Sequence, residues 1–425
     1  MAQNALDVLR ERGFIDWMSD EEALEKLFDT EMVTAYVGFD PTADSLHVGH
    51  LIPLMGLAWL QRLGHRPIVI AGGGTGMIGD PSMKSKERNL LTPEQIEANV
   101  NGVKPQLAHF VNFDCGENSA ILVNNYDWLS KMNFLEFLRD VGKYFSINYM
   151  IAKEHVRSRI TDPSKTLSFT EFSYTLLQSY DFYHLYKTYG CRLQMGGNDQ
   201  QGNITGGIEY IRKCDGGEVY GGTNPLLLTS AGHKFGKTES GAVWLDPKRT
   251  SPYQFYQFWI NTEDQGVEKL LKYFTFMSLD EIATIMERHA AAPEKREAQR
   301  VLAYEVTKVV HGEETAKNVQ RASEILFGGA FTPADLTDSM LHTLAAETPC
   351  GKVAELPKPL TDVLAEVGAC KSKGEAKRLI SGGGVSVNGV RAEEGAVLKA
   401  EDVLCGYYAL IRLGKKKYFM VGAAE

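Results

Sequence analysis

Two kinds of hydrophobic pattern alternate along the first half of the chain. Short apolar runs rich in β-branched and aromatic residues predict buried strands at 32–40, 67–71, 120–125 and 191–195. Longer apolar segments between them, such as GHLIPLMGLAWLQRLG at 49–64, predict helices. Strands that alternate with helices predict a doubly wound, Rossmann-like α/β fold, in which helices cover both faces of a parallel sheet. Ligands of such folds bind at the carboxyl ends of the strands.

Capping signals predict the starts of two further helices. Ser19 and Glu22 have the spacing of a capping box ahead of ALEKLF, which predicts a helix within the first 30 residues. Thr92, Pro93 and Gln95 combine a cap, a first-turn proline and a box partner. They predict a second helix, after the glycine-rich stretch GGGTGMIGD.

The pattern changes after about residue 250, where strand signals fade and helical periodicity dominates. Prolines within AAETPCGKVAELPKP then predict a linker. Beyond it, two short helical segments precede VSVNGV, whose Asn388–Gly389 pair predicts a tight turn, and a hairpin that turns at Gly414. We therefore predict a Rossmann-like domain at 1–230, a polar loop and helical domain at 231–345, a linker at 346–356 and a small α+β domain at 357–425.

The composition is that of an ordinary globular protein, with 44% hydrophobic and 23% charged residues. The net charge of −9 provides no global basic field that would attract nucleic acid. Residues 357–425 nevertheless contain 11 Lys and Arg against 8 Asp and Glu, a net of +3, which leaves −12 for residues 1–356. A polyanion is therefore expected to bind at the C-terminal end.

The six cysteines form no CxxC pair and no zinc-site spacing. They are interpreted as reduced core residues of a cytosolic protein, without a structural metal. No N-terminal segment has the pattern of a signal peptide, and no window approaches 18 consecutive apolar residues. We therefore expect a cytoplasmic protein that does not span a membrane.

Two short polar motifs carry the candidate chemistry. In PTADSLHVGH (41–50), two histidines and a glycine lie at the seam between a strand and a helix, where unpaired N–H groups attract anions. In HKFGKT (233–238), two lysines flank a glycine in a loop that suits a polyphosphate. Each motif alone is as consistent with solvated surface residues as with a site, but the pair is much more specific.

The motifs together resemble those of a known family. HVGH followed by a distant KFGKT resembles the HIGH and KMSKS signatures of class I aminoacyl-tRNA synthetases. The motifs YVGFDPTADSLHVGH, GDPS, TEFSYTLLQSYDF, QMGGNDQQGN and HKFGKT occur in the order seen in bacterial tyrosyl-tRNA synthetases. The resemblance covers essentially the whole chain. It implies a homodimeric tyrosine–tRNA ligase that converts L-tyrosine and ATP into tyrosyl-adenylate and then charges tRNA(Tyr).

The resemblance also implies a tyrosine pocket. Tyr174, Gln178 and Asp181 recur at i, i+4 and i+7 and therefore share one face of a helix. By resemblance, Asp181 and Tyr36 hydrogen-bond the phenol, whereas Tyr174, Gln178 and Asp80 bind the ammonium group. Gln194 is implied near the carboxylate, and the remaining implied lining residues are Thr75 and Asn125.

The implied ATP site surrounds the two signatures. The residues implied in catalysis at the phosphates are His47, His50, Thr42, Lys234, Lys237 and Thr238. Those implied in ATP binding are Gly38, Asp40, Gly49, Gly197, Asp199, Gln200, Lys84 and Arg88. Mg²⁺ is expected with ATP. The chain departs from the common GGSDQWGN pattern at Asn198 and Gln201, while the aspartate and the first glutamine are retained as Asp199 and Gln200.

The C-terminal unit resembles a small RNA-binding fold shared with a ribosomal protein. Its candidate phosphate contacts are Lys373, Lys377, Arg378, Lys415, Lys416 and Lys417. The apolar stretch NFLEFLRDVGKYFSINYM is either a subunit face or core.

Three alternatives stay open from the sequence. One is a nucleotidyltransferase of the same superfamily, and another is a tryptophanyl-tRNA synthetase, although Tyr36 with Asp181 suits a phenol better than an indole. The third is a non-catalytic RNA-binding protein, which the presence of His47, His50, Lys234 and Lys237 argues against.

Overall fold

The computed structural model describes residues 3–82, 91–162, 164–228, 235–238, 241–414 and 417–423, apart from the side chains of His155, Lys237 and Thr238. Residue contacts divide the chain into two compact units. The first comprises Met1–Thr250 with Thr262–Ala298, and the second comprises Ser251–Asn261 with Gln299–Glu425.

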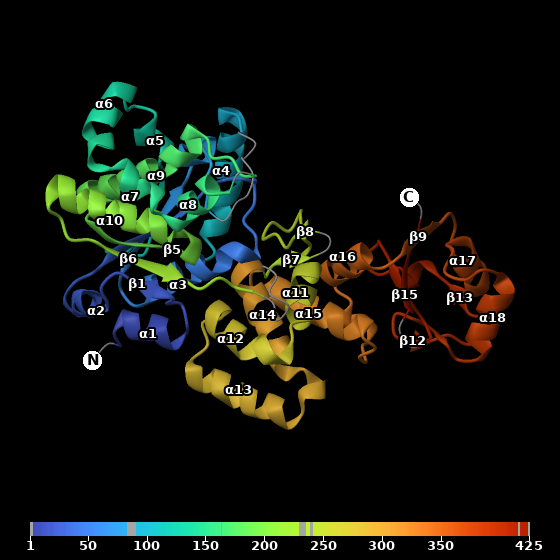
Figure 1. The fold of residues 1–425 in the computed structure, drawn as a ribbon. Coiled ribbons are helices and arrows are strands. Elements are labelled where there is room, and N and C mark those ends of the chain that lie inside the picture. The colour runs from blue at the N-terminus through green and yellow to red at the C-terminus, as the bar shows by residue number, and fades with distance from the viewer. Residues whose placement is uncertain are drawn as a thin grey trace. The chain divides into compact units, whose positions relative to one another are not determined.

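A mixed sheet lies at the centre of the first unit (Figure 1). Among the described residues its strand order is β1-β6-β5-β2-β3-β4, and all neighbours are parallel except the edge strand β1, which is antiparallel to β6. The prediction of a doubly wound α/β fold is confirmed, although the sequence pattern did not reveal β1 and β6. The strands are β1 (Trp17–Met18), β2 (Thr34–Phe39), β3 (Arg66–Ala71), β4 (Ile121–Asn124), β5 (Cys191–Gly197) and β6 (Tyr220–Asn224).

Long helices connect these strands, among them α4 (Pro93–Leu107) between β3 and β4. α3 (Leu51–Arg62) joins β2 to β3 and contacts both strands. α9 (Phe169–Tyr189) leads into β5, and α10 (Gln201–Asp215) joins β5 to β6. The helices α9 and α10 pack on each other and on β5. The other helices of this unit are α1 (Ala5–Glu11), α2 (Glu21–Thr30), α5 (Tyr126–Leu129), α6 (Phe134–Asp140), α7 (Ile147–Ile151), α8 (Glu154–Ile160), α12 (Asp264–Phe274) and α13 (Leu279–Ala291).

One of the two predicted capping boxes is confirmed. The Thr92 side chain accepts from the backbone of Gln95 at the start of α4, and the Gln95 side chain accepts from the backbone of Thr92. The prediction for Ser19 is wrong, because Asp20 caps α2. Ser19 Oγ instead accepts from the backbone N–H of Gly221 in β6, so it is engaged in the edge pairing of β1.

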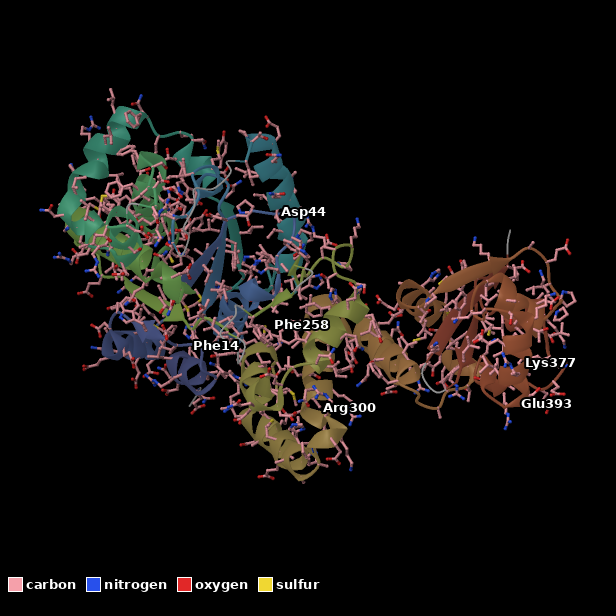
Figure 2. The ribbon with its side chains drawn as sticks, turned by 45° about the vertical axis from the view of Figure 1, so that its right-hand side comes forward. Phe14, Asp44, Phe258, Arg300, Lys377 and Glu393 are labelled. Carbon is pink, nitrogen blue, oxygen red and sulfur yellow. The ribbon has the colours of Figure 1, made fainter. Side chains whose placement is uncertain are left out.

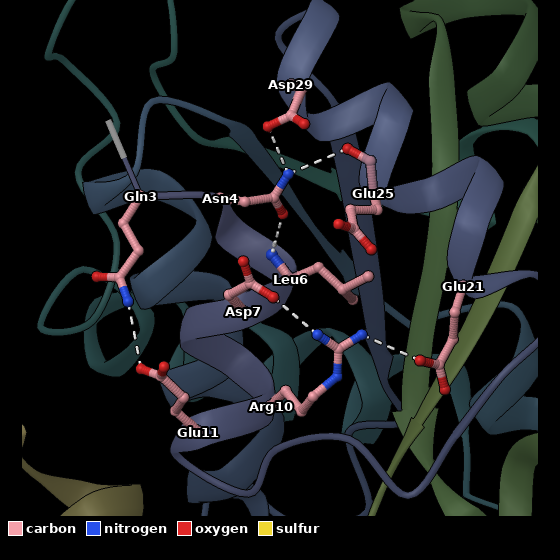
Figure 3. A network of polar contacts seen from close by, with 9 residues as sticks. All are labelled: Gln3, Asn4, Leu6, Asp7, Arg10, Glu11, Glu21, Glu25 and Asp29. Atoms are coloured by element: carbon pink, nitrogen blue, oxygen red, sulfur yellow. Dashed lines mark hydrogen bonds and ion pairs between the residues drawn. The ribbon is translucent and has the colours of Figure 1, made fainter. Parts of the chain in front are cut away.

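Asn4 joins the first two helices (Figure 3). Its Oδ1 accepts from the backbone N–H of Leu6 at 2.8 Å and so caps α1. Its Nδ2 donates to the backbone oxygen of Glu25 at 3.0 Å and to a carboxylate oxygen of Asp29 at 2.6 Å, both on α2. A single amide side chain therefore fixes α2 against the first turn of α1.

The second unit combines helices with a sheet whose described strands have the order β12-β11-β14-β15-β9. Side chains of β14 and β15 alternate between two cores. Ile411 and Phe419 pack with α17 and α18, whereas Leu410 and Met420 pack with α15 and α16. The elements are α11 (Pro252–Ile260), α14 (Glu297–His311, which begins in the first unit), α15 (Glu313–Leu326), α16 (Asp338–Glu347), α17 (Leu360–Glu366), α18 (Lys373–Ser381), β9 (Cys350–Val353), β10 (Lys358–Pro359), β11 (Val385–Val387), β12 (Val390–Arg391), β13 (Val397–Leu398), β14 (Ala409–Leu413) and β15 (Lys417–Ala423).

Both predicted turns of this unit are present. Asn388 and Gly389 have φ values of 49° and 86° between β11 and β12, and Gly414 has a φ of 65° between β14 and β15. The stretch 346–356 contains β9, which pairs in parallel with β15. The prolines of this region flank the short strand rather than interrupt it, because Pro349 directly precedes Cys350 and Pro357, just beyond the stretch, follows Val353.

The cysteines are free, as predicted, but only partly buried. Cys191 and Cys370 are core residues, whereas Cys115, Cys350 and Cys405 are exposed, so the prediction that all six are buried is wrong. Cysteine spacing reports bonding partners and carries no information on exposure. No helix among the described residues has the length and apolar character needed to cross a membrane.

Candidate active site

The loops that follow β2, β3 and β4 meet at the carboxyl edge of the sheet. Asp40 directly follows β2, Thr75 begins a short 3₁₀ helix after β3, and Asn125 follows β4. Thr75 Oγ1 donates to Asp40 Oδ1 at 2.7 Å, and Asn125 Nδ2 lies 2.9 Å from Thr75 Oγ1. Three residues far apart in sequence thus form one hydrogen-bonded row where a doubly wound fold binds ligands.

Asp181 extends this row into the interior. Its carboxylate accepts from Asn125 Nδ2 at 2.9 Å and from Trp128 Nε1 at 2.8 Å. Burial raises the pKa of Asp181 to about 7, although these two hydrogen bonds act in the opposite direction. Sequence reasoning did not select Trp128, although it lies in the same NNYDW stretch as Asn125.

Several buried polar atoms near Asp181 have no hydrogen-bond partner among the described residues. They are Tyr36 Oη, Gln178 Oε1 and Gln194 Oε1. Tyr36 is only 1% exposed, and its pKa is raised by burial and by the charge of Asp181. It is the register partner of Gln194 across β2 and β5. Because buried polar groups are normally paired, this cluster indicates a polar ligand.

A second network lies around Asp80. Gln200 Nε2 donates to Asp80 Oδ2 at 2.7 Å and to Asp199 Oδ2 at 3.0 Å, and the backbone N–H of Ser82 donates to Asp80 Oδ1 at 2.9 Å. Asn203, which sequence reasoning did not select, donates to Gln200 Oε1 at 3.2 Å. These contacts tie the loop after β3 to the loop after β5.

Tyr174 connects the two networks. Its hydroxyl donates to Asp40 Oδ2 at 3.0 Å. Its pKa is raised by burial first, and then by the charges of Asp40 and Asp80. Tyr174, one of the predicted tyrosine-pocket residues of α9, therefore contacts the carboxylates at the sheet edge.

The two histidines of HVGH are held by the backbone of their own motif. The backbone N–H of Gly49 donates to His47 Nδ1 at 3.0 Å, and that of His47 donates to His50 Nδ1 at 3.1 Å. The rings stack at a centroid distance of 4.0 Å. Because Nδ1 accepts in each ring, a neutral imidazole carries its proton on Nε2, which is then a donor. Burial lowers the pKa of His50 to about 3, so this ring is neutral at physiological pH.

Part of HKFGKT lies directly against HVGH. Gly236 has a φ of 84°, and a Cβ at this position would lie 3.0 Å from Cβ of Val48. The backbone N–H of Val243 donates to the Gly236 oxygen at 2.9 Å. Between these residues, β7 (Lys237–Thr238) pairs with β8 (Gly241–Ala242). The backbone next to Lys237 therefore packs against the HVGH turn.

Comparison with known proteins assigns this architecture. Residues 29–328 match the family described as tRNA synthetases class I (W and Y), and residues 341–421 match the tyrosine–tRNA ligase SYY-like C-terminal domain. The chain is 51% identical to the tyrosine–tRNA ligase of Anaeromyxobacter dehalogenans strain 2CP-1, over 99% of each chain. It is 49% identical to that of Geobacillus stearothermophilus, over 98% of this chain and 99% of the relative. The chain belongs to the tyrosine–tRNA ligase family.

Solved structures of tyrosyl-tRNA synthetases have a similar fold. A C-terminally truncated mitochondrial tyrosyl-tRNA synthetase of Aspergillus nidulans is 34% identical, with a TM-score of 0.70 over 76% of this chain and 94% of its own. The tyrosyl-tRNA synthetase of Archaeoglobus fulgidus, solved with L-tyrosine, is 17% identical, with a TM-score of 0.54 over 74% of this chain and 99% of its own. This second likeness shows the shared fold alone.

Several predicted site residues of this tyrosine–tRNA ligase lie at the edge of the networks. Thr42 is exposed, and its backbone N–H donates to the Asp40 backbone oxygen at 2.8 Å. Gly197, at the end of β5, is close enough to Asp199 that a Cβ would lie 2.5 Å from its carboxylate. Gly38 has only ordinary packing around it. Five predicted residues of the ATP site lie wholly or partly outside the described residues: Lys84, Arg88 and Lys234 entirely, and Lys237 and Thr238 as side chains.

The two departures from the family pattern are both tolerated at the loop surface. Asn198 Nδ2 donates to Asp16 Oδ2 at 3.2 Å, and Gln201 is exposed at the first position of α10. Asp199 and Gln200, which lie between them, keep their contacts with the Asp80 network.

The predicted RNA-binding residues lie in the second unit. Lys373, Lys377 and Arg378 are exposed on α18 (Figure 2 labels Lys377), and Lys373 pairs with Asp362 at 2.9 Å. Burial raises the pKa of the Cys370 thiol, and the charge of Lys417 partly offsets this shift, so Lys417 lies near the start of α18. Lys415 and Lys416 lie outside the described residues.

Proposed function

We propose that this tyrosine–tRNA ligase performs its two-step reaction with the networks around Asp181 and Asp80 and with the paired HVGH and KFGKT motifs. In the first step, a carboxylate oxygen of tyrosine attacks the α-phosphorus of ATP and pyrophosphate leaves. In the second, a ribose hydroxyl at the 3′ end of tRNA(Tyr) attacks the tyrosyl carbonyl carbon and AMP leaves. Positioning and charge stabilisation account for most of such catalysis.

Tyr36 and Asp181 recognise the phenol in this proposal. Tyr36 Oη is buried without a partner, and the Asp181 carboxylate is fixed by Asn125 and Trp128. A tyrosine hydroxyl that donates to Asp181 and accepts from Tyr36 satisfies both groups. Phenylalanine leaves the buried Tyr36 hydroxyl unpaired and brings no donor to the Asp181 carboxylate, which is strongly unfavourable. This pair is the observation that carries the proposal, because it distinguishes a tyrosine pocket from a general amino-acid pocket.

The Asp80 network binds the other end of the amino acid. Asp80 and Tyr174 line the sheet edge beside Asp40, and Gln178 supplies an unpaired buried oxygen that an ammonium group can donate to. Gln194 is proposed to donate from its amide to the tyrosine carboxylate, and Thr75 and Asn125 support Asp181.

The phosphates of ATP bind at the HVGH turn. The neutral imidazoles of His47 and His50 donate from Nε2 to the phosphate oxygens. The remaining donors to the phosphates are Thr42, Lys234, Lys237 and Thr238. Negative charge grows on the leaving pyrophosphate, so contacts that strengthen in the transition state raise the rate. Lys84 and Arg88 add positive charge. The nucleoside is placed against Gly38, Gly49 and Gly197, with Asp199 at the ribose and Gln200 and Asp40 beside the α-phosphate.

Mg²⁺ accompanies ATP in this proposal. No group of three or more His, Cys, Asp or Glu side chains suited to a metal occurs among the described residues. Mg²⁺ at nucleotide sites is usually held by substrate phosphates with one or two carboxylates, so a dedicated protein cage is not required. The carboxylates of Asp40 and Asp199 lie at the sheet edge where such a contact would form.

A second copy of the chain is proposed to cover the outer face of α6–α9. Large apolar side chains are exposed along these consecutive elements, and Leu135 and Phe134 are 73% and 67% exposed. The other exposed members are Leu138, Ile147, Ile151, Ile160 and Phe169. Soluble monomers rarely expose so many large apolar residues on consecutive elements. These residues support the reading of the stretch NFLEFLRDVGKYFSINYM as a subunit face.

The oligomeric state tests this surface. Phe134→Glu with Leu135→Glu should convert a dimer to a monomer in sedimentation velocity, because the charges cannot be buried unpaired. The matched control Phe327→Glu changes a 70% exposed phenylalanine in the second unit and should leave the dimer intact. A wild-type monomer at micromolar concentration contradicts the proposal.

The second unit is proposed to bind tRNA phosphates through the lysines and arginine of α18 and of the β14–β15 turn. This contact is electrostatic and should weaken with salt. Because the substrate is tRNA, a cytoplasmic location is proposed for the chain.

The activity is tested by tyrosine-dependent exchange of labelled pyrophosphate into ATP, followed by tyrosylation of tRNA(Tyr). Exchange that depends on tyrosine and not on phenylalanine or tryptophan supports the proposal. Exchange that depends on another acceptor, with none for tyrosine, favours a nucleotidyltransferase. Tyrosine-dependent exchange that persists in Asp181→Ala with unchanged selectivity overturns the assigned pocket.

A further inference from the structure

Trp244 lies beside the HVGH turn, although no motif of the sequence draws attention to it. It follows β8, and its ring meets His47 edge-on at a centroid distance of 5.8 Å and an interplanar angle of 64°. The backbones of His47 and Trp244 form an antiparallel bridge. Two flanking hydrogen bonds close the bridge: Val48 N–H to the Val243 oxygen and Leu245 N–H to the Leu46 oxygen, both at 2.9 Å.

A second set of contacts fixes the ring of Trp244. The Arg249 guanidinium lies 4.7 Å from the ring centroid, and Arg249 forms an ion pair with Asp44. The backbone N–H of Trp244 donates to Thr250 Oγ1 at 3.0 Å. Asp44 belongs to the loop between β2 and α3 (Figure 2), three residues before His47. Trp244 is therefore connected to the segment that carries the histidines in two ways: directly through His47, and indirectly through the Arg249–Asp44 ion pair.

The same segment anchors the KFGKT hairpin. Gly236 and Val243 pair at the base of β7 and β8, and Gly236 lies against Val48. Trp244 is the residue that follows Val243. A displacement of the β7–β8 backbone would therefore also displace the indole that contacts His47. Conversely, a displacement of the indole would shift the β7–β8 backbone.

We propose that Trp244 is a positioning residue for the adenylation step. It touches neither tyrosine nor ATP in this scheme. Its ring packs against the His47 imidazole and so holds His47 Nε2 toward the phosphates. The Arg249–Asp44 pair keeps the ring in this orientation. The inference rests on the proposed role of His47.

A merely structural tryptophan makes a different prediction. Its loss would lower the midpoint of thermal unfolding and affect tyrosine binding and both reaction steps together. A positioning residue that acts through His47 affects the rate of adenylate formation selectively, because small displacements of a catalytic donor reduce the rate much more than they reduce binding.

Three substitutions separate these cases. Trp244→Leu should slow adenylate formation at saturating ATP by roughly 10- to 100-fold, with the tyrosine dissociation constant within about twofold of wild type. Trp244→Phe retains an aromatic edge and should recover most of the rate. Arg249→Gln should slow the step by roughly two- to fivefold, because it removes only the cation above the ring. The matched control is Arg62→Gln, whose guanidinium lies 3.7 Å from the Phe276 ring away from the site, and which should leave the rate unchanged.

A double-mutant cycle with His47→Ala tests whether Trp244 acts through His47. The double variant His47→Ala with Trp244→Leu should be no slower than His47→Ala alone. If the rate reductions of the two single variants multiply in the double variant, Trp244 acts independently of His47. That result overturns this inference and leaves the proposed function intact. An unchanged rate in Trp244→Leu also overturns it. If His47→Ala itself retains the wild-type rate, the proposed role of His47 fails, and the inference fails with it.

Discussion

Removal of the Tyr36 hydroxyl should narrow the preference for tyrosine over phenylalanine. In Tyr36→Phe, tyrosine loses a neutral hydrogen bond worth about 0.5–1.5 kcal/mol. Phenylalanine gains as well, because a buried hydroxyl left unpaired costs about 1–3 kcal/mol, and this hydroxyl is absent from the variant. The two terms together reduce the ratio of kcat/KM values by roughly 10- to 10³-fold. Tyrosyl-tRNA synthetase is itself the reference case for this selectivity, at about 10⁵ without editing, so a preference of roughly 10²- to 10⁴-fold should remain through Asp181.

Pyrophosphate exchange with each amino acid measures this ratio directly. Tyr418→Phe is the matched control, because Tyr418 Oη is also buried without a partner among the described residues but belongs to the second unit. It should leave the ratio unchanged. A ratio for Tyr36→Phe within twofold of wild type refutes the assignment of Tyr36 to the phenol, and an equal change in Tyr418→Phe refutes its specificity.

Two further predictions concern the acidic pocket and the lysine loop. Burial raises the pKa of Asp181 from 3.8 to about 7, so its contribution to stability is fully present below pH 4 and is lost as the pH rises through 7. Urea unfolding of wild type and Asp181→Asn in the absence of tyrosine should show a difference that changes by roughly 4 kcal/mol between pH 4 and 8, and a pH-independent difference contradicts the shift. Lys237→Ala should slow adenylate formation by roughly 10²- to 10³-fold with little change in tyrosine affinity. Single-turnover kinetics with equilibrium binding test this, and a comparable loss of tyrosine binding removes Lys237 from the phosphates.

The fold was predictable where one pattern determined the local structure. The strand at 32–40 and the helix that ends before Gly64 are both present, and Gly64 has a φ of 92°. The edge strand β1 was not predictable, because its two residues carry no periodicity and form a strand only through pairing with β6. Ser19 shows the same limit, since its tertiary contact with Gly221 replaced the local cap.

The site was predictable as a set of motifs but not as a network. Spacing placed Asp181 on the same helix face as Tyr174, yet it gave no reason to select Trp128, whose indole N–H reaches Asp181 from α5. Asn203 and Trp244 are similar cases. Each acts through a neighbour rather than through a motif of its own, and only the three-dimensional contacts reveal that neighbour.

The central claim is that one end of the site reads a phenol and the other binds the triphosphate. A crystal structure with a non-hydrolysable sulfamoyl analogue of tyrosyl-adenylate tests it most directly. We predict the phenol oxygen within hydrogen-bond distance of Tyr36 Oη and of the Asp181 carboxylate, and the sulfamoyl group beside the HVGH turn. A phenol that lies away from Asp181, or an adenylate group away from His47, would contradict the account.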